Sequence, residues 1–427
     1  MSVVQPVPFP LTTLPGLRYG FLGFPLAFCA LPLYVLLPNL YAREFGIGLA
    51  ALGAVLLGAR LFDAIIDPLL GRWCDRLYQR SLFTVYGFGA FAAVVLSGGF
   101  GLLFFPLTRE PVALVVSTGL LLVLTYSAYS ALSVAHQSWG AMLGGDGVAQ
   151  SRVVAWREGL GLFGVVTAAA LPSLLGLKTM VAVFVVGLLA GWLLWLAAPR
   201  PVVVVALQQT GDMWQPWRVG AFRRLMLVFS LNGIASAVPA TLVLFFVQDR
   251  LEAPDAMQPL FLGSYFLVGA LSMPLWLRMV KRFGLAASWL LGMLLAIIVF
   301  TAALSMSAGD TWPFIAVCAV SGLALGSDLV LPGAMLAGVI ERSGHRGQAE
   351  GTYFGWWNFA SKLNLALAAG LALPLLQWLG YSPGARSPEA LGALTAVYCL
   401  VPCVLKAIAA LALYHLLIKP ERRLESQ

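Results

Sequence analysis

The sequence predicts an all-α polytopic membrane protein with twelve transmembrane helices in two six-helix halves. Composition, apolar windows and the placement of positive charge lead to this prediction. Of the 427 residues, 60% are hydrophobic and only 10% are charged, whereas a soluble domain carries about a quarter charged residues. This composition excludes a soluble globular protein. The net charge of the chain is +8. In a membrane protein such an excess of positive charge indicates basic cytoplasmic loops and not nucleic-acid binding.

Twelve windows are long and apolar enough to cross a bilayer, which takes about 20 mostly apolar residues. They cover residues 19–42, 47–71, 82–106, 112–142, 152–175, 179–198, 220–247, 259–279, 285–307, 313–340, 352–379 and 391–418. The longest break, residues 199–219, is predicted to be a central cytoplasmic loop. It separates an N-terminal half, residues 1–198, from a C-terminal half, residues 220–427. Two halves of six spans are typical of carriers built from repeats.

Lysine and arginine set the orientation, because cytoplasmic loops carry an excess of them. With the N-terminus inside, 17 of the 26 lie in inside loops and tails. The five that fall outside are Arg43, Arg109, Lys178, Arg250 and Arg386. We therefore expect both termini in the cytoplasm and the chain in the plasma membrane, which is the inner membrane if the source is bacterial.

Two short basic loops occupy corresponding places in the two halves, after the second and the eighth span. The first holds Gly71, Asp75, Arg76 and Arg80, and the second spans residues 278–284. The spacing of the first loop favours a cytoplasmic gate, in which Asp75 pairs with an arginine on a neighbouring helix. Topology alone also explains positive loops.

Few ionisable side chains fall inside the predicted spans away from their ends. They are Arg60, Asp63, Asp67, His136, Arg157, Glu158, Asp328, Lys362 and Lys406. A charged group at the centre of a span costs roughly 2.5–3.5 kcal/mol on insertion scales. Such residues face the bundle interior or water, so function is the default hypothesis for them.

The second span carries the sharpest pattern. Arg60, Asp63 and Asp67 are spaced by three and four residues, so they share one helical face. Two carboxylates on one face repel each other unless a positive charge neutralises them. Arg60, a bound cation or a proton can supply that charge. Pro68 follows directly and removes one backbone hydrogen bond of the helix. The pattern predicts a cation or proton site.

The remaining charged positions form expected pairs. Lys362 lies near mid-membrane and is the expected partner of the acid pair in the C-terminal half. Arg157 and Glu158 are adjacent, so we expect only one of them to face a cavity. Asp328 and Lys406 are expected to pair with each other, with snorkelling as the alternative for Lys406.

Three polar or aromatic positions have two interpretations each. A lone histidine such as His136 is as often a helix-packing residue as a site residue. Trp139 and Trp356 are explained equally well by an interfacial aromatic belt and by stacking on a sugar. For the neighbouring Tyr353 and Trp357 we favour the belt.

The chain resembles the glycoside–pentoside–hexuronide:cation symporters, the melibiose-permease-like branch of the major facilitator superfamily. "RYGFLGFP" with residues 41–71, "GGDGVAQSRVVAWRE" at 144–158 and residues 331–367 carry the resemblance.

The resemblance implies roles for individual positions. Asp63 and Asp67 match the aspartates that bind the coupling cation. The family's helix-five arginine and helix-eleven lysine match Arg157 and Lys362. A polar position of helix four falls on Ser133 or His136. The implied mechanism is alternating access with cation or proton symport of a sugar or another small organic solute.

Two departures from the family pattern leave the ion and the solute open. Ile66 stands where the family often has asparagine, so one oxygen ligand is lost. Sodium and protons therefore both stay open as the coupling ion. The first span offers almost no polar group, so a less polar solute such as a lysolipid is an alternative. Uncoupled transport and export also stay open.

A Mg²⁺-dependent intramembrane transferase is a distant alternative. Such enzymes surround the metal with three or four carboxylates, and the run from Asp63 to Asp75 continues with Gln79. We expect no enzyme activity and no cofactor beyond the coupling ion. The expected partners are a small-molecule solute and the lipid bilayer, with a functional monomer and no nucleic acid.

Overall fold

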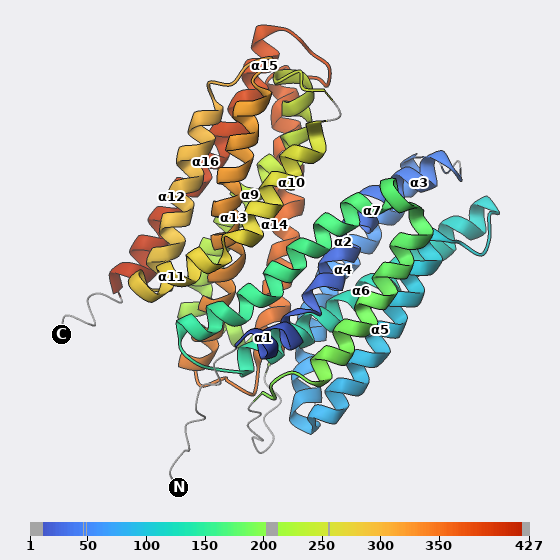
Figure 1. Ribbon diagram of the computed structural model, residues 1–427, viewed down its shortest axis with the longest axis vertical. Helices are drawn as coiled ribbons and strands as arrows, with labels where there is room; N and C mark the ends of the chain where they lie inside the picture. The colour runs from blue at the N-terminus through green and yellow to red at the C-terminus, as the bar shows by residue number, and fades with distance from the viewer. Residues whose placement is uncertain (1–11, 46, 48, 202–211, 255–256, 421–427) are drawn as a thin grey trace. The chain divides into compact units, whose positions relative to one another are not determined.

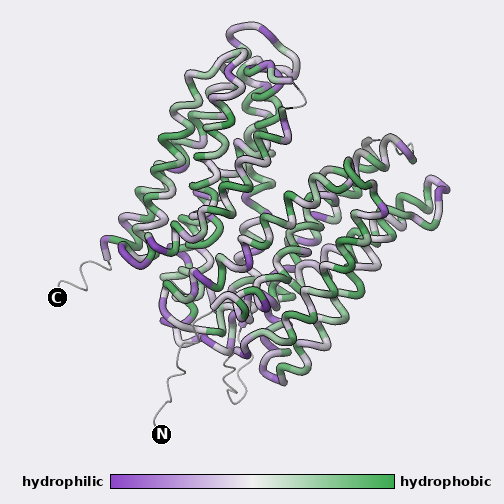
Figure 2. The backbone as a smooth tube through the Cα atoms, viewed as in Figure 1, coloured by the Kyte–Doolittle hydropathy of each residue, from purple (hydrophilic) through white to green (hydrophobic). Residues whose placement is uncertain are grey.

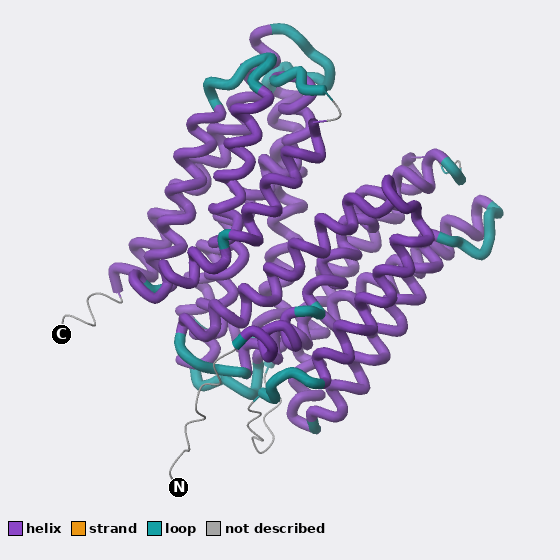
Figure 3. The backbone as a smooth tube through the Cα atoms, in the orientation of Figure 1, coloured by secondary structure: helices purple, strands orange, loops and turns teal. Residues whose placement is uncertain are grey.

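The computed structural model describes residues 12–45, 47, 49–201, 212–254 and 257–420. Within these ranges the chain forms helices joined by loops and contains no strand (Figure 3). The helices are apolar along their lengths, while hydrophilic residues gather at their ends (Figure 2). The predicted all-α polytopic class is confirmed.

The chain divides into two compact units. Unit 1 comprises Met1–Pro216 with Ala337–Phe359, and unit 2 comprises Trp217–Leu336 with Ala360–Gln427. The predicted boundary between two halves at residues 199–219 stays a prediction, and residues 202–211 of that loop lie outside the described part. Segment 337–359, which the sequence assigns to the C-terminal half, packs with unit 1.

Unit 1 is built from helices of the first six predicted spans. They are α1 (Thr13–Gly20), α2 (Gly23–Leu31), η1 (Pro32–Leu36), α3 (Leu37–Arg43), α4 (Leu49–Arg80), α5 (Leu82–Phe104), α6 (Pro111–Met142) and α7 (Gly147–Leu196). Helix α2 packs along α7, and α6 packs against both α4 and α5 (Figure 1). The short α8 (Gln215–Arg218) spans the boundary between the units.

Unit 2 contains the later helices. They are α9 (Gly220–Phe245), η2 (Phe246–Arg250), α10 (Gln258–Leu271), α11 (Met273–Phe283), α12 (Leu285–Ala303), α13 (Thr311–Arg342), α14 (Glu350–Trp378), α15 (Pro388–Thr395), η4 (Ala396–Leu400), α16 (Val401–Leu413) and η5 (Tyr414–Ile418). The end of α13 and the start of α14 belong to unit 1. Helix α16 packs against α9 and α12 (Figure 1).

The described part of the chain has ten helices long and apolar enough to cross a membrane, or eleven if the bent pair α10 and α11 is one span. The sequence predicts twelve, and the helix outside this set is α4. Helix α4 covers the predicted window 47–71, but Arg60, Asp63 and Asp67 interrupt its apolar run. The fifth and sixth spans share α7, which breaks at Gly176, where φ is +81°.

Candidate functional site

Helix α4 presents its polar stripe to the interior of unit 1. Asp63 is 7% exposed and Asp67 is completely buried. The opposite stripe, which includes Leu57, Leu61 and Ile65, is more than half exposed. Charged groups in membrane helices face the protein interior because lipid cannot solvate them. The predicted common face of the two aspartates is therefore a buried one.

Helix α6 supplies a side chain that contacts Asp63. Ser130 donates its hydroxyl hydrogen to Asp63 Oδ1 at 2.8 Å, and Ser130 is 1% exposed. The sequence pointed to Ser133 or His136 on this helix. Ser133 lies one turn further on, and its hydroxyl accepts a hydrogen bond from Gln137 at 3.3 Å. The serines of "SAYSALS" recur every three residues. This spacing predicts a polar face on α6, but it does not predict which serine contacts Asp63.

Helix α14 crosses α4 directly over Asp67. A Cβ atom added to Gly355 would lie 2.6 Å from the Asp67 carbonyl oxygen and 2.9 Å from Pro68 Cα. Gly71 and Gly351 make the same kind of backbone approach one turn away. No side chain larger than hydrogen fits between the two backbones at these positions. The first turns of α14 therefore pack directly against the backbone of α4 at Asp67 within unit 1.

Asp75 binds the start of α14, and not an arginine as the sequence predicted. Its carboxylate accepts hydrogen bonds from the Gly351 N–H at 2.6 Å, the Thr352 N–H at 2.8 Å and the Thr352 hydroxyl at 2.6 Å. The first N–H groups of a helix lack intrahelical acceptors and carry partial positive charge. A helix N-terminus therefore supplies the charge expected from arginine.

The other predicted gate residues divide into two groups. Gly71 lies in the crossing of α4 and α14, whereas Arg76 and Arg80 are exposed. A cavity of about 10 Å³ beside Asp75, lined by Arg72, Arg76, Gln79, Gln348, Ala349 and Thr352, has room for about one water molecule.

Replacing Asp75 with alanine is expected to lower the thermal stability of the protein and to expose Cys74. Three donors of α14 would lose their acceptor, and each buried donor left without one lowers the stability by about 1–3 kcal/mol. Cys74 is now 2% exposed, so its labelling by N-ethylmaleimide, read by peptide mass spectrometry, should rise. Thr352→Val removes only the hydroxyl contact and should give an intermediate value. Equal labelling in all three proteins would contradict this role of Asp75.

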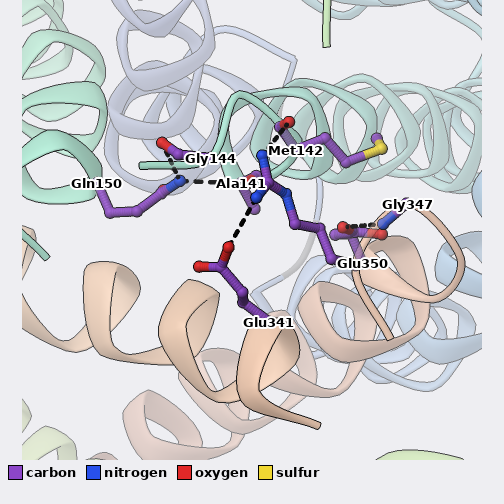
Figure 4. A network of polar contacts seen from close by, with 8 residues as sticks. Ala141, Met142, Gly144, Gln150, Glu341, Gly347 and Glu350 are labelled. Carbon is purple, nitrogen blue, oxygen red and sulfur yellow. Dashed lines mark hydrogen bonds and ion pairs between the residues drawn. The ribbon is translucent and has the colours of Figure 1, made fainter. Parts of the chain in front are cut away.

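A second set of polar contacts joins the loop after α6 to the loop before α14 (Figure 4). Gln150 donates to the carbonyl oxygens of Ala141 at 3.1 Å and Gly144 at 3.0 Å. Arg346 donates to Glu341 at 2.7 Å and to the Met142 carbonyl oxygen at 3.5 Å. A Cβ atom at Gly144 would also meet the Arg346 guanidinium, so two sequence patches that carry the family resemblance meet within unit 1.

The loop before α14 also fixes its histidine. His345 Nδ1 lies 2.8 Å from the Tyr353 hydroxyl. Partial burial lowers the pKa of His345 below its ordinary value, which favours the neutral ring at pH 7.

His136 lies in a packing contact between α1 and α6. Its Nε2 is 2.8 Å from the Tyr19 carbonyl oxygen, and the Tyr19 hydroxyl donates to the His136 carbonyl oxygen at 3.1 Å. Because a carbonyl only accepts, Nε2 carries the hydrogen. His136 and Tyr19 are both completely buried. This placement favours helix packing over contact with a solute.

The two tryptophans with open interpretations both donate to backbone carbonyl groups. The Trp139 indole donates to Pro199 at 2.9 Å and is completely buried. The Trp356 indole donates to Met213 at 2.9 Å, and its ring centroid is 4.9 Å from that of Trp214. These contacts favour structural roles for both residues.

Arg157 and Glu158 pair with each other, although we expected adjacent side chains to diverge. The arginine Nη2 lies 2.5 Å from Glu158 Oε1, and their side chains are 13% and 27% exposed. The long arginine side chain can fold back along the helix to reach its neighbour. Arg60 lies over the Tyr34 ring, 4.1 Å from its centroid. Lys362 belongs to unit 2 and is partly exposed there.

The predicted pair in unit 2 is confirmed. Lys406 Nζ lies 2.9 Å from Asp328 Oδ2. Lys406 is only 4% exposed, so its ammonium does not snorkel to an interface. Among the residues that the structure describes, no group of three histidine, cysteine, aspartate or glutamate side chains is arranged to hold a metal.

Many long apolar helices around buried charges define a multi-span membrane protein. The chain belongs to the family described as MFS/sugar transport protein, whose model matches residues 16–419. It is thus a member of the major facilitator superfamily. A search of curated proteins finds no match.

Solved transporters share the fold. A bacterial homologue of the iron transporter ferroportin in an outward-facing state has a TM-score of 0.68 at 17% identity, over 95% of this chain and 99% of that one. The human organic anion transporter MFSD10 (TETRAN) gives 0.59 at 18%, over 92% and 99%. FucP, in the outward conformation, gives 0.58 at 14%, over 92% and 98%. At these identities the likeness shows the fold alone.

Proposed function

We propose that the protein is a melibiose-permease-like secondary active symporter, which couples uptake of a sugar or another small organic solute to a cation or proton. The observation that carries this proposal is the acid pair of α4. Asp63 and Asp67 lie one turn apart on a buried face, and the Ser130 hydroxyl from α6 donates to Asp63.

We propose that a mobile positive charge takes part in stabilising this pair. Burial disfavours a carboxylate, and a second carboxylate one turn away disfavours it further. A proton on one acid or a cation near both removes the repulsion. Carboxylate and hydroxyl oxygens are ligands that hard cations take, and the Ser130 hydroxyl can rotate to accept instead of donating.

The crossing of α4 and α14 links the proposed ion site to the proposed gate. Gly355 covers Asp67, and two turns along α4 Asp75 binds the first N–H groups of α14. Separation of α14 from α4 would uncover Asp67 and remove the donors of Asp75 in one movement. We propose that this separation is the inward-opening step of alternating access.

A solute less polar than a sugar is the second candidate. A sugar site needs several convergent hydrogen-bonding groups, and α2, "GFPLAFCAL", carries no polar side chain except the Cys29 thiol. Cys29 is completely buried and donates to the Leu26 carbonyl oxygen. This helix favours an apolar portion in the solute, as in a lysolipid.

A thermal-shift screen on the purified protein tests both candidates. Sugars and lysophosphatidylcholine are added in sodium or choline chloride at several pH values. We expect one solute class to raise Tm, and to do so more strongly with sodium or at lower pH. The same dependence on sodium and pH in the double variant Asp63→Asn, Asp67→Asn would contradict the proposed ion site.

A further inference from the structure

Lys406 lies inside a polar cluster that four helices of unit 2 build in their apolar interior. Asn232 and Ser236 come from α9, Trp289 from α12, Asp328 from α13 and Lys406 from α16. Asn232 is 3% exposed and Trp289 is completely buried. The cluster lies within unit 2, whereas the acid pair of α4 lies within unit 1.

The Lys406 ammonium lies between two oxygens. It donates to Asn232 Oδ1 at 2.7 Å and to Asp328 Oδ2 at 2.9 Å. Ser236 donates to Asp328 Oδ2 at 3.2 Å, and the Trp289 indole donates to Asp328 Oδ1 at 2.9 Å. These three donors contact both carboxylate oxygens of Asp328, and the positive charge of Lys406 balances its negative charge.

Packing alone does not explain this arrangement. A buried ion pair is often no more stable than apolar side chains of the same volume, because both charges must leave water. Here an amide oxygen and a carboxylate oxygen converge on one ammonium nitrogen. These are the ligand types that hard cations take in proteins.

We infer that Lys406 is a tethered cation, whose ammonium permanently fills an oxygen site for a monovalent cation formed by Asn232 and Asp328. The ammonium cannot diffuse away because its side chain is anchored on α16. Unit 2 thus balances the charge of its buried carboxylate without an exchangeable ion. This inference does not depend on the solute or the ion of unit 1.

Chemical rescue of Lys406→Ala tests the inference. The variant keeps the two oxygens and vacates the space of the lysine side chain. We measure Tm of the purified protein in propylammonium, sodium and choline chloride at equal ionic strength. We expect a lower Tm than wild type in choline, and saturable recovery in propylammonium, which replaces the missing part of the side chain, or in sodium.

The matched control is the double variant Asp328→Asn, Lys406→Ala, which lacks the carboxylate and should show no recovery. Equal recovery in this control, or no recovery of Lys406→Ala in either salt, overturns the inference. If Lys406→Ala does not survive purification in choline, the salts are present from extraction onward. If intact protein is then obtained only with propylammonium or sodium, the result supports the inference. If Lys406→Ala cannot be purified in any of the three salts while the double variant can, the inference is overturned.

Discussion

The variant Asp67→Asn is expected to lose accumulation of the solute against its gradient while still inserting into the membrane. Asp67 is completely buried and lies one turn from Asp63. An amide cannot take up a proton, and it cannot balance the charge of a bound cation. We expect uptake to fall to the level of equilibration. The measurement is uptake into proteoliposomes under an imposed sodium or proton gradient, with the solute that the thermal-shift screen identifies.

Two further variants complete this experiment. Glu389→Gln changes an exposed acid on α15 and should transport like the wild type. Asp63→Asn should behave like Asp67→Asn, since either change leaves one carboxylate where the proposal requires two. Solute accumulation that survives the loss of both aspartates would show that the acid pair does not couple transport.

The variant Gly355→Leu is expected to force α14 away from α4 and to slow transport by about tenfold or more. A Cβ at Gly355 already meets the Asp67 carbonyl oxygen at 2.6 Å. Overpacking of this kind costs typically 1–3 kcal/mol, and 1.4 kcal/mol changes an equilibrium constant tenfold. The conformation in which α14 covers Asp67 should therefore lose population.

Gly370→Leu is the matched control on the same helix, because a Cβ at Gly370 meets no atom within 4 Å. It should transport at nearly the wild-type rate. Cys74 reports the movement of the helices: N-ethylmaleimide should label it faster in Gly355→Leu than in Gly370→Leu. Similar transport and labelling in the two leucine variants would argue against a tight crossing at Gly355.

The sequence predicts those features that depend on spacing along one helix. Asp63 and Asp67 share a face because they are four residues apart, and lipid makes that face an interior one. Asp328 and Lys406 pair because they are opposite charges isolated in apolar spans. The all-helical membrane fold follows from the length and number of apolar windows.

Features that depend on the contact between two helices are not readable from the sequence. The choice of Ser130 over Ser133 depends on the rotation of α6 about its axis relative to α4. The sequence does not predict the partner of Asp75, because two of the groups that donate to its carboxylate are backbone N–H groups. Every residue except proline has such a group. The cover over Asp67 depends on Gly355, and glycines are frequent throughout this chain, with 44 in all.

Ion movement driven by the solute tests the central claim most directly. Proteoliposomes without any ion gradient receive the identified solute outside, and internal sodium or internal pH is recorded. We predict that inward flow of the solute carries sodium or protons with it in the wild type, and that Asp67→Asn carries neither. Solute entry in the wild type without movement of either ion would contradict coupling at Asp63 and Asp67.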